Sequence, residues 1–209
     1  MASKKTVALI TGSTRKVRLG PFFTTYVRDM IAPHCPTFSL EIVDLADQGL
    51  PILDETNPAA GQPADDPTSY YEHEHTRKWS AVVRKYDAFI FVTPEYNRSV
   101  PAGLKNALDF LFHEWNGKPA GVVSYGGREG ARASAHLRDI LAALKLVVLP
   151  TAPGLSTSRR MLPYVGEHKS VSDDDRQRWK ESGAEAQIVT LAQELVAELE
   201  RASKAALSN

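Results

Sequence analysis

The segment Gly12–Gly20 carries residue types that suit the binding of a multiply charged anion. It reads Gly-Ser-Thr-Arg-Lys-Val-Arg-Leu-Gly, and so offers a glycine for a turn, hydroxyl groups and three cations, with no carboxylate. A helix is expected to follow, and the first turn of a helix has unpaired N–H groups at the positive end of its dipole. These features predict a phosphate site. The simpler alternative is that Ser13 and Thr14 cap the helix and that the cations are solvated.

The same segment restricts the kind of phosphate ligand. It contains neither the Walker A pattern nor a complete G-x-G-x-x-G. The absence of the first argues against a nucleoside triphosphatase, and the absence of the second weakens the case for a classical NAD-binding fold.

Two further segments follow expected strands and complete a recognisable set of motifs. One is Pro94-Glu95-Tyr96-Asn97, which continues through PAGLKNALD from Pro101, and the other is Ser124-Tyr125-Gly126-Gly127. Together with the Gly-Ser-Thr-Arg of the first loop, and in this order, they resemble the NADPH-dependent FMN reductase family. The resemblance covers roughly Val7–Pro150. That family contains flavin-dependent quinone, azo-dye and chromate reductases.

The resemblance implies a bound FMN and assigns residues to its parts. It places the phosphate at Ser13, Arg15, Arg18, Leu19 and Gly20, the isoalloxazine ring along Pro94, Glu95, Tyr96 and Asn97, and the pyrimidine end at Ser124, Tyr125, Gly126 and Gly127. Some branches of the family carry Ser and Asn near positions 18 to 20, so arginine and backbone N–H groups would serve here instead. Such loops suit a flavin, because its ring needs hydrogen bonds along one edge and cover on one face. N–H donors at Gly126 and Gly127 would stabilise the anionic reduced flavin.

The implied reaction is the transfer of two electrons from NADPH or NADH, through FMN, to a quinone or a similar acceptor such as an azo compound, free flavin or a metal oxyanion. The cofactor carries this chemistry, so no acid–base pair is required. Asn97, near flavin N5, and Tyr96, at the edge of the substrate site, are the catalytic candidates. The alternative is a flavodoxin-like FMN-binding electron carrier or regulatory module without a small substrate of its own. Carriers of that kind tend to be strongly acidic, whereas this chain is neutral with a basic loop, which favours the enzyme. A binding protein with an empty or repurposed site also stays open.

Other reactive side chains give weaker signals. His73 and His75 have a spacing that could attract a metal, but they lack a clear third ligand, so a solvated helix start is expected and no metal site is predicted. No serine lies in a G-x-S-x-G elbow, which argues against a hydrolase. Cys35 is the only cysteine, which excludes an intrachain disulfide and predicts a loop or core thiol.

The elements that position these loops alternate between short apolar blocks and longer segments of helical period. Strands are expected at Thr6–Thr11, Ser39–Leu45, Asp87–Thr93, Lys118–Tyr125 and Leu146–Thr151, helices at Leu19–Ile31, Thr76–Lys85, Pro101–Phe112, Ala131–Leu144 and Asp173 to about Ala202, and irregular chain at Asp54–Ser69 and Ala152–Ser172. The alternation predicts an α/β flavodoxin-like three-layer fold, with a parallel sheet in the order 2-1-3-4-5 and helices on both faces. Ligands of such folds bind where the first and third strands end.

Composition sets the remaining expectations. A chain of 209 residues fits one domain spanning residues 1–209. A net charge near zero removes the broad attraction that nucleic-acid and membrane binders use. Met1–Lys5 lacks the apolar core of a signal peptide and no apolar stretch is long enough to span a bilayer, so a cytoplasmic location is expected. The apolar residues of Leu104–Trp115 leave core packing and an oligomer interface both open, and the resemblance implies a homodimer or homotetramer through this region.

Overall fold

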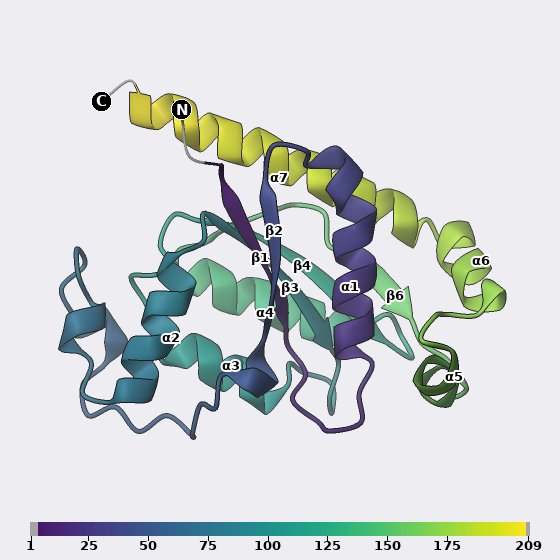
Figure 1. The fold of residues 1–209 in the computed structure, drawn as a ribbon, viewed down its shortest axis with the longest axis horizontal. Helices are drawn as coiled ribbons and strands as arrows, with labels where there is room; N and C mark the ends of the chain where they lie inside the picture. The colour runs from purple at the N-terminus through teal and green to yellow at the C-terminus, as the bar shows by residue number, and fades with distance from the viewer. Residues whose placement is uncertain (1–3, 208–209) are drawn as a thin grey trace.

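A parallel sheet forms the centre of the molecule (Figure 1), whose computed structural model describes residues 4–207. Its strands are β1 (Thr6–Thr11), β2 (Ser39–Asp44), β3 (Ala88–Pro94), β4 (Pro119–Gly126) and β5 (Val147–Val148). They run in the order β2-β1-β3-β4-β5, and a further strand, β6 (Gly154–Ser156), pairs with β4 beyond the end of β5. The predicted order is therefore confirmed.

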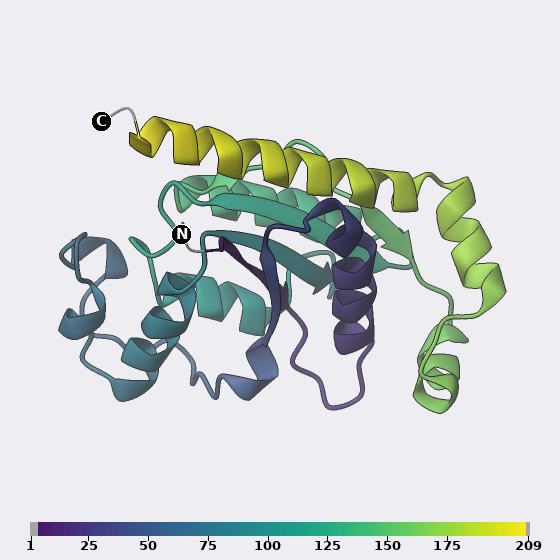
Figure 2. The same ribbon diagram turned by 45° about the horizontal axis from the view of Figure 1, so that its top comes forward.

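Helices cover both faces of the sheet, as the alternation of strands and helices predicted. On one face lie α1 (Gly20–Ile31), α6 (Asp173–Glu181) and α7 (Ala184–Leu207), and on the other lie α2 (Glu74–Arg84), α3 (Ala102–Asp109) and α4 (Ala131–Ala143). Figure 2 shows α7 running along the sheet beside α1, opposite α2 and α3. Alternate residues of β1 serve the two cores, so that Leu9 packs under α1 and Ile10 under α3.

Three expectations for the second half of the chain were wrong. The stretch after residue 152 contains β6 and a helix, α5 (Met161–His168), whose Pro163 is tolerated because it lies in the first turn. The last helix is divided into α6 and α7, because Gly183 adopts a φ of 76° that ends α6. The fifth strand is also shorter than expected, since β4 continues alongside β6 and no longer pairs with β5 beyond Val148.

Short 3₁₀ turns complete the connections, at Ala32–His34, Leu45–Asp47, Ala59–Gly61 and Thr68–Tyr70. The last two interrupt the excursion between β2 and α2, which is otherwise irregular, as expected. Between residues 4 and 207, no helix combines the length and apolarity needed to cross a lipid bilayer.

Candidate functional site

The loops after β1, β3 and β4 meet at one edge of the sheet because these strands are parallel neighbours. Thr11 is paired with Val92, and the Gly12 N–H donates to the Val92 carbonyl at 2.9 Å. Pro94 is paired with Tyr125, and the Glu95 N–H donates to the Tyr125 carbonyl at 3.1 Å. The three segments named by the sequence motifs thus lie side by side.

The first of these loops leads into a helix whose N-terminus is free. Leu19 occupies the N-cap position without any side-chain capping hydrogen bond, Pro21 lies in the first turn, and no acidic residue is present there. The alternative in which Ser13 and Thr14 merely cap this helix is therefore wrong. The N–H groups of the first turn remain available to an anion.

Two buried hydroxyl groups converge on the start of α1. The side chain of Ser13 is 0% exposed and that of Tyr125 is 4% exposed, and neither hydroxyl has a hydrogen-bond partner within residues 4–207. A Cβ atom added to Gly20 would lie 2.0 Å from Ser13 Oγ and 3.2 Å from Tyr125 Oη, so both hydroxyls lie close to Gly20 and Ser13 Oγ occupies the space that a side chain would need. An unpaired buried hydroxyl costs about 1–3 kcal/mol, and a phosphate at the helix N-terminus would relieve that cost. The residues present therefore fit a phosphate group.

Burial also keeps the Tyr125 hydroxyl protonated. Desolvation by burial raises the pKa of Tyr125 above its usual value. The tyrosine ring is held by stacking on Phe23 of α1, with ring centroids 4.3 Å apart. Tyr125 is thus a fixed hydrogen-bond donor below the loop.

The cations of the loop divide into one that is paired and two that are free. Arg18 donates to both carboxylate oxygens of Asp44 at 2.8 Å and also to the Ser13 carbonyl, and the hydrogen bond to Asp44 raises the pKa of Arg18. Arg15 and Lys16 are exposed, and neither makes a hydrogen bond or an ion pair with the residues between 4 and 207. The charge of Arg18 therefore holds the loop against the end of β2, while Arg15 and Lys16 can face a ligand.

Arg15 also connects the first loop with the second. Its guanidinium lies 3.9 Å from the centroid of the Tyr96 ring, a cation–π contact. Tyr96 itself begins a tight turn in which its N–H donates to the Ser99 carbonyl and its carbonyl accepts from the Ser99 N–H. A ligand bound between the loops would contact both side chains.

The tip of the second loop has an unusual backbone. Asn97 and Arg98 have φ values of 49° and 69°, in the left-handed region that asparagine tolerates and arginine adopts less readily. Both residues are exposed. A hydrogen bond of 3.0 Å between Ser99 Oγ and His136 Nδ1 joins this turn to α4. The sequence interpretation missed His136, whose proximity depends on the packing of α4.

Glu95 and Ser124 use their side chains inside the protein. The Glu95 carboxylate accepts from the Arg132 N–H at 3.0 Å and so caps the start of α4. The Ser124 hydroxyl donates to the Glu129 carbonyl at 2.7 Å. Both side chains therefore shape the loops. The N–H groups of Glu95 and Ser124 are also used inside the protein, by the carbonyls of Tyr125 and Pro153, and the predicted contact of these two residues with a cofactor stays a prediction.

The turn after β4 leaves its glycine backbone open. No atom lies within 4 Å of the position that a Cβ of Gly127 would take, whereas the carbonyl of Gly126 already accepts from the N–H groups of Glu129 and Thr157. The Gly127 N–H can thus be approached closely, as the sequence predicted for a flavin edge. That contact stays a prediction.

Asp44 is the second residue of the site that the sequence interpretation missed. It ends β2, next to the loop of three cations. An acid at the end of a strand beside a basic loop is a signal that could have identified it as the counter-charge. Its side chain is 16% exposed and that of Arg18 is 13% exposed, so the pair is largely screened from water.

The other candidates lie outside this site. His75 Nε2 lies 2.9 Å from Asp54 Oδ1 and its ring stacks on His73, but no group of three or more possible metal ligands occurs within residues 4–207. Cys35 is buried in the core, and burial raises the pKa of its thiol. Leu104, Leu108, Leu111 and Trp115 are each at most 1% exposed, which confirms core packing for these residues.

Comparisons with known proteins agree with this geometry. The family described as NADPH-dependent FMN reductase matches residues 5–160. The chain belongs to the NADPH-dependent FMN reductase family. Among its relatives in this family, an NAD(P)H-dependent FMN reductase of Schizosaccharomyces pombe is 42% identical over 154 residues, which cover 73% of this chain and 74% of that protein. Another, from Nectria sp., is 36% identical over 193 residues, covering 90% of this chain and 94% of that protein.

The similarity extends to proteins named for quinone reduction and to solved structures. A quinone reductase of Pseudomonas putida is 33% identical over 154 residues, covering 70% of this chain and 74% of that protein. The structure of FerB, a flavoenzyme NAD(P)H:(acceptor) oxidoreductase from Paracoccus denitrificans, is 25% identical with a TM-score of 0.66, covering 94% of this chain and 98% of that one. This chain and FerB thus share the flavodoxin-like fold along almost their whole length.

Proposed function

We propose that this protein is an FMN-dependent NAD(P)H oxidoreductase that passes two electrons to quinones or similar small acceptors. The observation that carries the proposal is the convergence of the unpaired Ser13 and Tyr125 hydroxyls at the uncapped start of α1, next to the free cation of Arg15. Buried donors, a helix dipole and a cation together suit a phosphate dianion. Because the chain belongs to the NADPH-dependent FMN reductase family, we infer that the phosphate is that of FMN.

The chain's own residues bind and orient the cofactor. Ser13, Tyr125 and the N–H groups of Gly20 and Phe22 would donate to the phosphate, and Arg15 would supply charge. Arg18 with Leu19 fixes the course of the loop. The ring would lie along the Pro94–Asn97 backbone, and the Ser124–Gly127 turn would donate to its pyrimidine end. Bound FMN supplies the capacity to accept a hydride and release two electrons. In the loop after β3, Tyr96 is half-buried and Asn97 is exposed. Both residues would border the position of the nicotinamide or the acceptor.

The acceptor class rests on the names of the relatives. The Pseudomonas putida protein is named a quinone reductase, and a protein of Burkholderia sp. that is 32% identical over 151 residues is named 2-hydroxy-1,4-benzoquinone reductase. The exposed loop after β3, which carries the aromatic side chain of Tyr96, suits flat acceptors of this kind. Azo compounds, free flavin and metal oxyanions are the further acceptors to assay.

An anaerobic titration tests the cofactor, the reductant and the acceptor together. The purified protein, loaded with FMN, is expected to be yellow, to bleach on addition of NADPH or NADH, and to regain its colour when a benzoquinone is added. A protein that takes up no FMN would refute the proposal. A protein that binds FMN but is not reduced by either nucleotide would instead support the alternative of an electron carrier.

We also infer assembly into a homodimer or homotetramer near α3. The leucines of this helix lie in the core, but Ile52 beside it is 87% exposed and Leu53 is 43% exposed. Asn106 of α3 holds this segment by accepting from the Leu53 N–H at 2.9 Å and donating to the Pro51 carbonyl. Light scattering of the wild type and of Ile52→Asp tests this, because a monomeric wild-type protein would contradict the inference.

A further inference from the structure

The loop after β3 ends in a tight turn whose backbone is strained. Tyr96 and Ser99 exchange both of their backbone hydrogen bonds, at 3.0 and 3.1 Å, and the two residues between them have positive φ. A two-residue turn of this kind favours Asn followed by Gly, because glycine adopts a positive φ without steric cost. Here the pair is Asn97-Arg98, and Arg98 has a φ of 69°. The turn therefore needs support from the surrounding structure to keep this conformation.

The helix α4 supplies such support. The hydrogen bond between Ser99 Oγ and His136 Nδ1 is 3.0 Å long. One helical turn earlier, the Arg132 N–H donates to the carboxylate of Glu95, which directly precedes the turn. Leu137, 0% exposed, anchors α4 in the core. The loop is thus attached to α4 just before the turn and again at its end.

A second side chain that contacts the turn is already assigned to another task. The Arg15 guanidinium lies over the Tyr96 ring, but this side chain is exposed and the proposed function assigns its charge to the phosphate. A bound phosphate would compete with the ring for this cation. The contact from α4 does not depend on the phosphate loop, so it would hold the turn whether or not Arg15 binds a ligand.

We propose that His136 is a positioning residue, which holds Ser99 and thereby fixes the place of Tyr96 and Asn97 beside the bound substrate. The proposal rests on the proposed function, in which these two residues border the nicotinamide or the acceptor. Strained backbone is retained where the surrounding structure fixes it, and such positions cluster at ligand sites. His136 acts through Ser99 and needs no contact with the flavin. Its contribution is to keep the substrate site in one geometry.

Hydrogen exchange tests the support of the turn without any redox reaction, with and without FMN. In His136→Ala the amides of Tyr96 and Ser99 are expected to exchange roughly 2- to 10-fold faster than in the wild type, because a hydrogen bond contributes about 0.5–1.5 kcal/mol. His136→Asn is expected to keep the wild-type rate, since its amide oxygen can take the place of Nδ1. His168→Ala is the matched control, because this exposed histidine bonds to the Tyr164 carbonyl of its own helix. Wild-type exchange in His136→Ala would overturn the inference.

A second substitution tests whether strain is what the histidine opposes. Arg98→Gly removes the steric cost of the positive φ. The double variant Arg98→Gly/His136→Ala is therefore expected to regain the slow exchange of the wild type at Ser99, after correction for the intrinsic rate of its sequence. Exchange as fast as in His136→Ala alone would contradict the proposed role.

Kinetics tests the effect on the substrate. The value of kcat/KM for a benzoquinone is expected to fall roughly 2- to 10-fold in His136→Ala and to stay at the wild-type value in His136→Asn and His168→Ala. Faster exchange together with a wild-type kcat/KM in His136→Ala would refute the positioning role alone. A wild-type protein that takes up no FMN, or whose flavin neither nucleotide reduces, would refute the proposed function instead, and the exchange rates would still report on the turn.

Discussion

Replacing Gly20 with alanine separates the role of the phosphate loop in binding from its role in stability. The added methyl group would lie 2.0 Å from Ser13 Oγ, 3.0 Å from Thr11 Cγ2 and 3.2 Å from Tyr125 Oη, all of them buried. Overpacking of this kind costs about 1–3 kcal/mol. Alanine is favoured over glycine inside a helix by about 1 kcal/mol. The free energy of unfolding of the flavin-free protein is therefore expected to fall by about 0–2 kcal/mol.

The effect on FMN is expected to be larger. The methyl group displaces the Ser13 hydroxyl from its position at the start of α1, and a hydrogen bond to a charged group contributes about 1.5–3 kcal/mol. That loss corresponds to binding weaker by roughly 10- to 150-fold. Quenching of flavin fluorescence on titration measures the dissociation constant, and urea unfolding of the flavin-free protein measures stability.

A double-mutant cycle makes the test specific. Ser13→Ala removes an unpaired buried hydroxyl and is expected to leave the flavin-free protein as stable or more stable, while weakening FMN binding. In the double variant the new methyl group occupies the space of the deleted hydroxyl, so stability recovers but affinity does not. Gly61→Ala is the control, because no atom lies within 4 Å of its Cβ position. Wild-type FMN affinity in Gly20→Ala, or additive effects on stability in the double variant, would refute the reasoning.

Three further predictions follow from the charged groups. Arg15→Ala is expected to weaken FMN binding by about 1.5–3 kcal/mol if its charge reaches the phosphate, and an unchanged dissociation constant would exclude that role. Asp44→Asn leaves Arg18 without its counter-charge, so urea unfolding should show a loss of about 1–3 kcal/mol; wild-type stability would show that the pair does not hold the loop. Burial lowers the pKa of Lys118 from 10.5 to about 8. Between these two pH values the amine is protonated in the unfolded chain and neutral in the folded chain, so the free energy of unfolding rises with pH. Relative to Lys118→Met, the wild type should gain up to about 1.4 kcal/mol per pH unit in urea unfolding from pH 8 to 9.5, and parallel curves would contradict the buried amine.

The motifs along the sequence identified the loops of the site but could not assign their side chains. Glu95 was expected along the flavin ring, and its carboxylate instead caps α4. Arg18 was expected at the phosphate, and its guanidinium is bound by Asp44, 26 residues further along the chain. Local sequence shows which charges a loop contains, whereas their partners come from other elements. Three expectations stay predictions. They are the assignment of these residues to FMN, a single domain spanning residues 1–209, and a cytoplasmic location.

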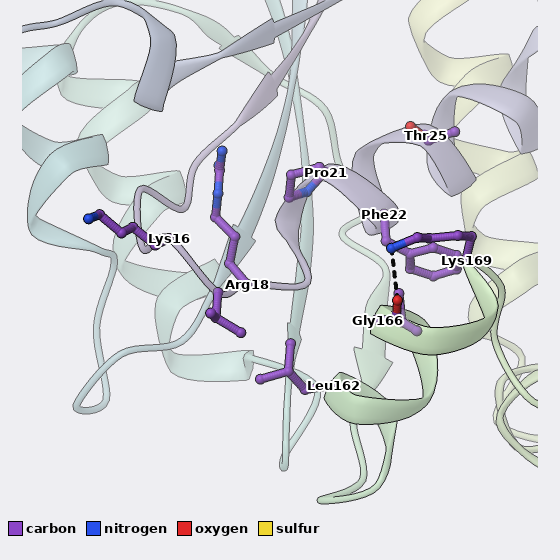
Figure 3. A pocket seen from close by; sticks show the side chains of 10 residues that line it. Lys16, Arg18, Pro21, Phe22, Thr25, Leu162, Gly166 and Lys169 are labelled. Carbon is purple, nitrogen blue, oxygen red and sulfur yellow. Dashed lines mark hydrogen bonds between the residues drawn. The ribbon is translucent and has the colours of Figure 1, made fainter.

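The second half of the chain was harder to predict because its elements are short. β6 has only three residues, too few for a period to be visible, and it forms because β4 extends past β5 and offers it a free edge. α5 contains a proline and a glycine within eight residues, so its composition is typical of a loop. Residues of α5 and of α1 line one cavity (Figure 3), and no pattern in the sequence indicates that the two helices lie close together.

The sequence by itself determined the parallel sheet, its order and the edge at which the three loops of the proposed site meet. Short continuous apolar runs indicate strands that are covered on both faces, and alternation with helices leaves few ways to connect them. Only the tertiary structure decided that the Ser13 and Tyr125 hydroxyls, more than a hundred residues apart, are buried without partners next to Gly20. Their proximity depends on the register of β4 against β3 and on the packing of Phe23 on Tyr125. These are long-range contacts, and the pattern of residues along the chain does not specify them.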